Sequence, residues 1–189
     1  MISPSRYIDV VPMGDVGEQD LQDLAVSIKE QFGLRVKVSR NQGFPHYAFD
    51  PARRQYNSNL ILKKLVDNAL PAALKVLGVS SVDLFNPIFS FVVGEAQFGG
   101  RCAVISTYRL RGKPSNQSRL GCNTLAIRME KEAIHELGHT FGLRHCADPS
   151  CVMHYSVGTE LTDCKFAFFC PACRDVMLWH LGTDLFLKG

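Results

Sequence analysis

Residues 133–145 read AIHELGHTFGLRH, and this stretch decides how the rest of the chain is interpreted. It contains the pattern H-E-x-x-H-x-x-G-x-x-H, with histidines at His135, His139 and His145. The first two are four residues apart on an expected helix, so their imidazoles project from the same face. Two imidazoles placed in this way can bind one Zn²⁺ at about 2.0–2.1 Å each.

The remaining positions of the pattern complete a catalytic site. Gly142 has no Cβ and can adopt a left-handed conformation, so we expect it to end the helix and let His145 reach the metal from outside it. Three protein ligands leave a fourth position for water, as in catalytic zinc sites. Glu136 is the expected general base towards the zinc-bound water. Because zinc lowers the pKa of that water to roughly 7, the pattern predicts zinc-dependent hydrolysis of peptide bonds.

The alternative is an amphipathic helix whose histidines are solvated or satisfied within the core. At this composition H-E-x-x-H should occur by chance in about 1 of 100 chains, and the extended pattern in about 1 of 50,000. The extended form therefore favours the metal site.

Length, charge and composition argue against other classes of protein. The chain has 189 residues, a length typical of one domain with a substantial core. A formal net charge of +3 is too mild to indicate a nucleic acid or membrane partner, and no apolar run is long enough to span a bilayer. The N-terminus lacks the features of a secretory signal. We expect a cytoplasmic monomer whose partner is a peptide or protein substrate.

Cysteine usage also indicates metal binding. The chain has seven cysteines, an odd number, and six of them follow residue 120. In a protein expected to be cytoplasmic, both features favour metal ligands over a disulfide framework.

Hydrophobic periodicity predicts an α/β domain. Strands are expected at 6–12 and 34–39 around a helix at 15–33, which together form a β-α-β unit with parallel strands. The other expected elements are a helix at 59–77, interrupted at Pro71, strands at 88–93 and 102–108, the active helix at 123–141 and a final helix at 174–181.

The histidine pattern resembles that of the metzincin clan of zinc peptidases. The residues after it read H-C-x4-C-x-M…C-x-x-C and resemble the archaemetzincins in particular, over about 40 residues. The family pattern has roughly one residue more between the methionine and the last cysteine pair, which we interpret as a difference in loop length. The resemblance implies a compact α/β (α+β) zincin fold, with a mixed twisted sheet, an active-site helix and a zinc-stapled C-terminal part.

The resemblance also implies individual roles. Met153 would be the Met-turn methionine beneath the histidines, and Cys146, Cys151, Cys170 and Cys173 would bind a second, structural zinc. The chemistry of the residues agrees, because four thiolates in two close pairs form a closed tetrahedral site. The chain would then hold two Zn²⁺ ions. A redox C-x-x-C at the last cysteine pair is the alternative.

Tyr155 completes V-M-H-Y, which resembles the Met-turn of the astacins, a sister family. It is a candidate oxyanion stabiliser, against the alternative of a packed tyrosine. Other histidines and cysteines are expected to lie outside the metal sites, the cysteines as small buried hydrophobes: His46, His154, His180, Cys102, Cys122 and Cys164. Of these, Cys164 is the one able to replace an assigned ligand.

The metzincin resemblance places the substrate along an edge strand above the metal, for which we expect residues 102–110. We also expect one metallopeptidase domain with an upper subdomain, 1–142, and a lower subdomain, 143–189. Two alternatives remain at this point: a non-catalytic zinc-containing module that binds peptides or regulates, and a zinc-ribbon-like nucleic acid binder. The modest charge argues against the second.

Overall fold

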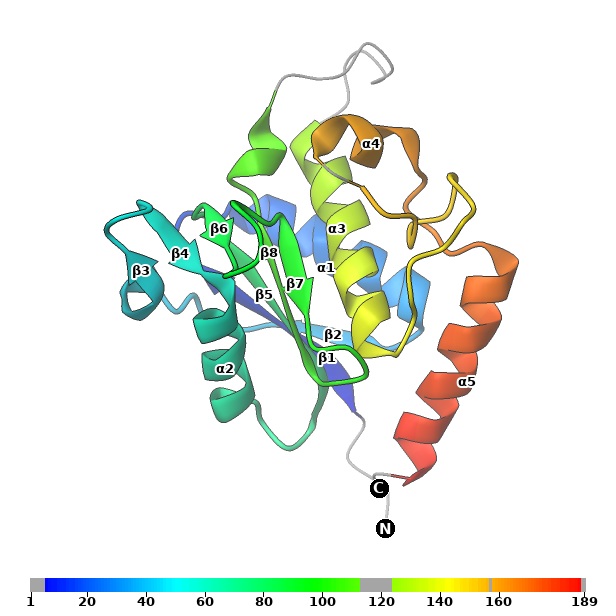
Figure 1. Cartoon of the computed structure of the whole chain (residues 1–189). Helices are drawn as coiled ribbons and strands as arrows, with labels where there is room; N and C mark the ends of the chain where they lie inside the picture. Colours follow the sequence, from blue (N-terminus) through cyan, green and yellow to red (C-terminus); the bar gives the residue numbers. More distant parts are fainter. Residues whose placement is uncertain (1–5, 113–123, 157, 188–189) are drawn as a thin grey trace.

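The computed structural model describes residues 6–112, 124–156 and 158–187, which form an α/β domain (Figure 1). Its helices and strands are β1 (Tyr7–Met13), α1 (Glu18–Phe32), β2 (Arg35–Val38), β3 (Phe49–Asp50), β4 (Gln55–Asn57), α2 (Ser58–Asn68), β5 (Ala73–Ser80), β6 (Leu84–Phe85), β7 (Gly94–Ala96), β8 (Cys102–Ser106), α3 (Thr124–Thr140), α4 (Thr159–Cys164) and α5 (Pro171–Leu187).

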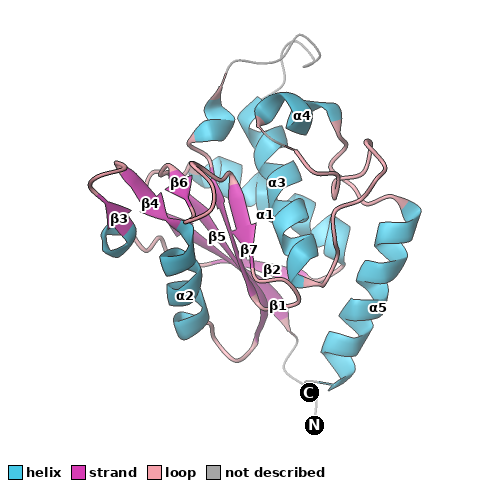
Figure 2. Ribbon diagram, in the orientation of Figure 1, coloured by secondary structure: helices cyan, strands magenta, loops and turns pink. Residues whose placement is uncertain are grey.

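A mixed sheet forms the centre of the domain. Its strands follow the order β2-β1-β5-β8-β7, in which β7 is antiparallel to β8 and the other neighbours are parallel. A smaller sheet has the order β3-β4-β6. Figure 2 shows α1 and α3 together on one side of the strands and α2 on the other. The predicted mixed α/β fold is confirmed.

The first β-α-β unit forms as its periodicity predicts. β1 and β2 pair in parallel, and the buried side of α1 carries Leu21, Leu24, Ile28 and Phe32. Gly33 follows the helix with φ +66°, a left-handed conformation that glycine adopts without a steric penalty.

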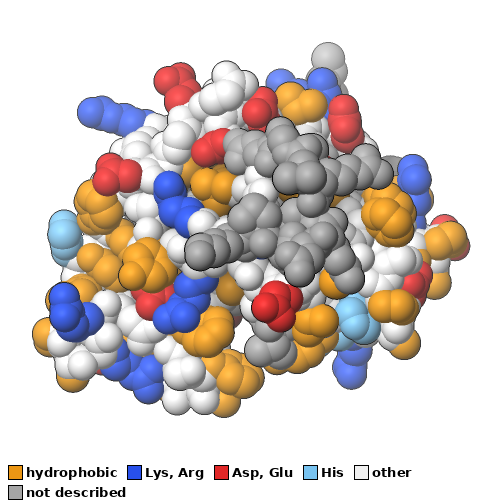
Figure 3. All heavy atoms as spheres, turned by 90° about the horizontal axis from the view of Figure 1, so that it is seen from above, with side chains coloured by type: hydrophobic (Ala, Val, Ile, Leu, Met, Phe, Trp, Pro, Cys, Tyr) orange, Lys and Arg blue, Asp and Glu red, His pale blue; other side chains and the backbone are white. Residues whose placement is uncertain are grey.

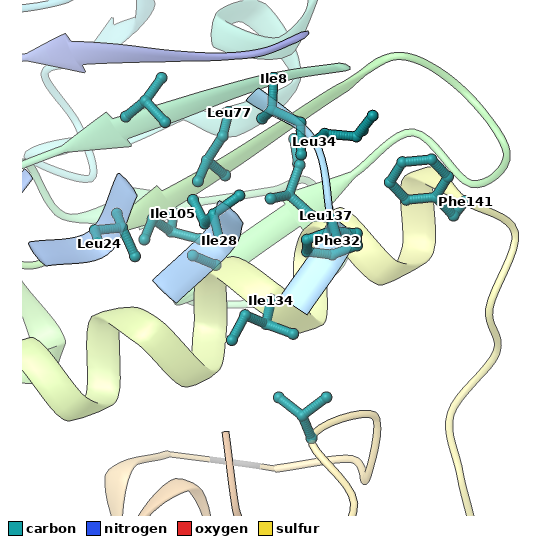
Figure 4. Packing of buried hydrophobic residues seen from close by; sticks show 14 of the residues in the cluster. Ile8, Leu24, Ile28, Phe32, Leu34, Leu77, Ile105, Ile134, Leu137 and Phe141 are labelled. Carbon is teal, nitrogen blue, oxygen red and sulfur yellow. The ribbon is translucent and has the colours of Figure 1, made fainter. Parts of the chain in front are cut away.

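The main hydrophobic core lies between the sheet, α1 and the active helix α3 (Figure 4). Ile8, Leu77 and Ile105 come from three adjacent strands, and Ile134 and Leu137 come from α3. The rings of Phe32 and Phe141 stack with centroids 5.3 Å apart, which connects the end of α1 to the residue after α3. The active helix is therefore held against the sheet along its apolar side.

The expected helix at 59–77 is wrong in its second half. α2 ends at Asn68, and Ala73–Ser80 is β5, a central strand whose eight residues are all buried. Its sequence, ALKVLGVS, is mostly apolar and shows no alternation, which is typical of a strand covered on both faces but does not distinguish it from a buried helix. Pro71 marks the change from one element to the other.

Two expectations about strands near the cleft are also wrong. Residues 88–91 form no strand, and β7 begins at Gly94, inside the expected connection. The expected substrate strand, 102–110, contains β8, which lies between β5 and β7 inside the sheet. The edge strand beside the active helix is therefore β7. Sequence periodicity does not report strand order, which depends on contacts between distant residues.

The surface carries both signs of charge. On the face seen in Figure 3, basic and acidic side chains lie interspersed among hydrophobic ones. Among the described residues, no helix is both long and apolar enough to cross a bilayer.

A buried lysine joins the central strand to the end of the active helix. Lys75 is 1% exposed, and its Nζ donates hydrogen bonds to the carbonyl oxygens of Gly100 (2.9 Å) and Thr140 (2.8 Å). The same ammonium lies 4.4 Å from the ring centroid of Phe141. Since a buried charge is costly without partners, these contacts fix β5 relative to the last turn of α3.

We expect Lys75→Met to lower the free energy of unfolding by about 2 kcal/mol, because two carbonyl oxygens lose their charged donor. Guanidinium chloride unfolding measures the change. Lys63→Met is the control, since the exposed pair of Lys63 with Asp67 should contribute only about 0.5 kcal/mol or less. Equal effects of the two substitutions would contradict the role of Lys75.

Candidate active site

The last turn of α3 and the turn after it bring three histidines together. α3 ends at Thr140, and Gly142 has φ +81°, the left-handed conformation expected at this position. The amide of Leu143 donates to the carbonyl of Gly138 (3.1 Å). The chain then leaves the helix, and the ring of His145 comes within 4.9 Å of the His139 ring, measured between centroids.

Backbone carbonyls fix the orientation of the two helical imidazoles. His135 Nδ1 lies 2.8 Å from the carbonyl oxygen of Val152, and His139 Nδ1 lies 2.7 Å from that of Leu143. A carbonyl only accepts hydrogen bonds, so each Nδ1 carries the proton and each Nε2 presents its lone pair. The two Nε2 atoms are 3.1 Å apart.

This donor set fits a zinc ion. Two lone pairs that face each other at such a distance repel unless a cation lies between them, and tetrahedral zinc separates its nitrogen ligands by about 3.3 Å. Ligand atoms of His135, His139 and His145 all lie within 4.8 Å of one another. Burial lowers the pKa of each of the three imidazoles, which favours the neutral form that binds metals.

Glu136 shares a cleft with the histidines. The cleft has a volume of about 440 Å³ and lies between α3, residues 86–95 and the segment after Met153. Glu136 is 7% exposed. Burial, followed by the charge of Glu132, raises the pKa of the Glu136 carboxyl well above its usual value. A carboxylate with a raised pKa is a stronger proton acceptor.

Met153 and Tyr155 both lie next to the histidine cluster, Met153 against Gly138 of the active helix and Tyr155 against His145. Met153 is fully buried, and its Sδ packs so closely on Gly138 that a Cβ there would be 2.5 Å away. The Tyr155 ring centroid lies 4.9 Å from that of His145, and the side chain is half exposed at the cleft. Both positions are compatible with the roles that the resemblance implies.

The four cysteines of the predicted second site also come together. Sulfur atoms of Cys146, Cys151, Cys170 and Cys173 lie within 4.8 Å of one another, and those of Cys146 and Cys170 are 3.8 Å apart. A disulfide has a sulfur separation of about 2.05 Å, whereas tetrahedral zinc with bonds of about 2.3 Å separates its sulfur ligands by about 3.8 Å. The donor set and its spacing fit a zinc ion.

A short loop joins the two clusters. The amide of Cys146 donates to the carbonyl of Met153 (3.0 Å), and the amide of Cys170 donates to Cys151 Sγ (3.3 Å). The carbonyl of Val152 orients the imidazole of His135. In the sequence, Val152 lies between Cys151 of the cysteine cluster and Met153, which is buried next to the histidines. The orientation of the His135 imidazole therefore depends on the position of the loop that carries Cys151.

Among the described residues, the two candidate metal clusters include no other histidine and no other cysteine. His154 Nδ1 instead contacts the carbonyl of Cys146 (2.9 Å). Cys102 is buried as expected, but Cys164 is exposed, so the expectation of a buried hydrophobe is wrong there. Its thiol lies at the end of α4 and donates to the carbonyl of Glu160 (3.3 Å). Cys122 lies outside the described residues.

Sequence reasoning missed three residues of the cleft. Gly94 packs against Glu136, and Glu132 and Lys165 line the cleft as buried charged side chains. Glu132 is one helical turn before Glu136, a spacing that indicates a shared face. Neither Gly94 nor Lys165 belongs to a motif, so only the fold shows their position.

Comparison with known proteins identifies the family. The model of peptidase family M54 matches residues 25–178. The archaemetzincin of Thermococcus kodakarensis is 37% identical over 190 residues, which cover 95% of this chain and 100% of that protein.

Solved structures agree. The crystal structure of the archaemetzincin of Methanopyrus kandleri has a TM-score of 0.79 and 32% identity, covering 94% of this chain and 97% of that one. That of Archaeoglobus fulgidus, complexed with malonate, has a TM-score of 0.75 and 32% identity, covering 90% and 99%. The chain therefore belongs to the archaemetzincins, peptidase family M54, and is a zinc metallopeptidase.

Proposed function

We propose that this chain hydrolyses peptide bonds with a zinc ion held by His135, His139 and His145 and with Glu136 as the general base. The observation that carries the proposal is the convergence of the three imidazoles and the Glu136 carboxylate on one cleft. When bound, zinc supplies Lewis acidity, lowering the pKa of a water ligand to about 7 and polarising the scissile carbonyl.

The protein groups position and transfer protons. Glu136 accepts a proton from the attacking water and returns it to the nitrogen of the leaving amine. Tyr155, which lines the cleft beside His145, donates a hydrogen bond from its hydroxyl group to the developing oxyanion. Met153 acts as the Met-turn methionine, an apolar support beneath the histidines that is packed against Gly138.

Substrate is proposed to add as an extended strand along β7. This strand is the last of the five-stranded sheet, and its residues Gly94 and Glu95 line the cleft. A peptide paired with a free sheet edge gains main-chain hydrogen bonds that do not depend on its sequence. Because Gly94 touches the Glu136 side chain, such a peptide passes directly over the general base.

We also propose that Cys146, Cys151, Cys170 and Cys173 hold a second, structural zinc. Four thiolate ligands leave no open position for a substrate, so this ion contributes to folding. Clustered cysteines also support a cytoplasmic location, since thiols stay reduced there. We further propose that the chain is a monomer without a nucleic acid partner. We also propose that its two subdomains divide after residue 142.

Glu136→Ala tests the mechanism. We expect activity on peptides to fall by about 10²–10⁴-fold because the general base is lost, while the fold and bound zinc are retained. Peptide cleavage assays and native mass spectrometry measure the two properties. Glu160→Ala, which removes an exposed carboxylate from α4, should keep full activity. Equal activity of Glu136→Ala and the wild type would exclude this mechanism.

Gly94→Ala tests the placement of Glu136. A Cβ at this position would lie 2.6 Å from Glu136 Cγ and 2.7 Å from Oε1, so the carboxylate must move. We expect kcat/KM to fall by roughly tenfold or more with unchanged zinc content, because small displacements of catalytic groups are costly. Gly182→Ala, where a Cβ meets open space, is the control. Wild-type kinetics in Gly94→Ala would show that the position of the Glu136 carboxylate does not depend on the absence of a side chain at residue 94.

Cys170→Ser tests the connection between the two metal sites. Loss of the cysteine site should loosen the loop that carries Val152, and we expect zinc affinity at the histidines to fall by about tenfold or more, as for other outer-shell changes. Competition with a chromogenic chelator measures this affinity. Cys164→Ser, an exposed cysteine outside the cluster, is the control. If Cys170→Ser releases one zinc but leaves the affinity of the other unchanged, the two sites are independent.

A further inference from the structure

A buried ammonium group faces the cleft close to the histidines. Lys165 is 2% exposed and lines the same cleft as Glu136. After burial, its charge is the largest cause that lowers the pKa of His135 and of His145. The ammonium therefore lies within electrostatic reach of the reaction centre, although no step of the proposed mechanism uses it.

The described partners of Lys165 do not use all three hydrogen-bond donors of its ammonium group. Its Nζ donates one hydrogen bond to the carbonyl oxygen of His154, at 3.3 Å, and lies 3.8 Å from Glu132 Oε1, beyond hydrogen-bond distance. An ammonium has three donors, and a buried one is costly unless they are used. Lys131, buried at the same helix interface, donates to the carbonyls of Thr162 (3.0 Å) and Asp163 (3.1 Å) instead.

The fold does not need Lys165 to hold α4 against α3. Arg128 makes a two-pronged ion pair with Asp163, with N–O distances of 2.7 and 2.6 Å. Thr162 Oγ1 donates to Glu132 Oε1 at 2.9 Å. Together with the contacts of Lys131, these bonds fix α4 directly before Lys165 in the chain, so the ammonium is held by its neighbours rather than holding them.

We propose that Lys165 and Glu132 form a polar subsite for a substrate side chain that ends in a carboxyl or carboxamide group. The inference rests on the proposed peptidase function and adds to it a substrate class. A carbonyl oxygen from the substrate supplies a second acceptor for Lys165, besides the carbonyl of His154.

The charges around the subsite define what it accepts. Glu132, Glu136 and Glu95 are the carboxylates that line the cleft, and Lys165 is its lysine among the described residues. An amide group can donate to Glu132 while it accepts from Lys165, whereas a carboxylate uses the ammonium alone. An aliphatic side chain gives the ammonium no acceptor beyond the carbonyl of His154, and a lysine side chain places two cations together.

The test uses the full chain loaded with zinc and a peptide that it cleaves. Glu, Gln, Leu and Lys are substituted in turn at each of the positions flanking the scissile bond. At one position we expect kcat/KM for Glu or Gln to exceed that for Leu by about tenfold or more, as for a hydrogen bond to a charged group. A preference for Glu identifies recognition of charge, and one for Gln identifies recognition by the Lys165–Glu132 pair.

Lys165→Met should bring this ratio close to one, whatever its kcat/KM for the Leu peptide, because the methionine side chain has no donor for a substrate carbonyl. Lys131→Met is the matched control, a buried lysine of the same interface that does not line the cleft, and it should keep the preference. Two results overturn the inference: no preference for Glu or Gln at any position, or an unchanged preference in Lys165→Met.

A binding measurement separates this inference from the peptidase proposal. Peptide hydroxamates that carry a Glu, Gln or Leu side chain are titrated into wild type and Lys165→Met by calorimetry, which needs no turnover. Tighter binding of the Glu or Gln compound by the wild type alone supports the subsite even if no peptide is cleaved, an outcome that would refute only the catalytic proposal. Equal affinities of both proteins for all three compounds contradict the subsite even if peptides are cleaved.

Discussion

Two hydrogen bonds to backbone carbonyls orient the imidazoles of the active helix, and the rest of the site depends on them. Val152 O holds His135 Nδ1, and Leu143 O holds His139 Nδ1. Both acceptors lie outside the helix, in the segment that follows Gly142. Rotation of either ring would direct its Nε2 away from the common centre, so the helix alone does not define a metal site.

The segment after the active helix carries both carbonyl acceptors, so its position must be fixed for the imidazoles to be oriented. Val152 and Met153 are fully buried in the main core, and the neighbouring Cys151 belongs to the four-cysteine cluster. A long helix packed on a sheet supplies the rigid side of the site, and a metal-stapled loop is proposed to supply the other. The carbonyl of His154, in the same segment, accepts a hydrogen bond from Lys165, so this segment contacts both the histidines and the proposed substrate subsite.

The predictions from sequence were most accurate where the information is local. The spacing of His135 and His139 on a helix, the stop at Gly142 and the two cysteine pairs are short-range patterns, and the structure brings these residues together. The expected helix at 59–77 runs into the start of β5 because a strand buried on both faces has no alternation to detect. The position of β7 at the sheet edge and of Lys165 in the cleft depend on strand order and on packing between distant segments, which no local pattern contains.

The proposed site and its support require two zinc ions in the chain, one on three histidines and one on four cysteines. Diffraction data collected from crystals on both sides of the zinc absorption edge test it most directly, because anomalous difference maps locate zinc and its ligands together. We expect two peaks per chain, one among His135, His139 and His145 and one among Cys146, Cys151, Cys170 and Cys173. A zinc-loaded crystal with a single peak, or with a disulfide within the cysteine cluster, would contradict it.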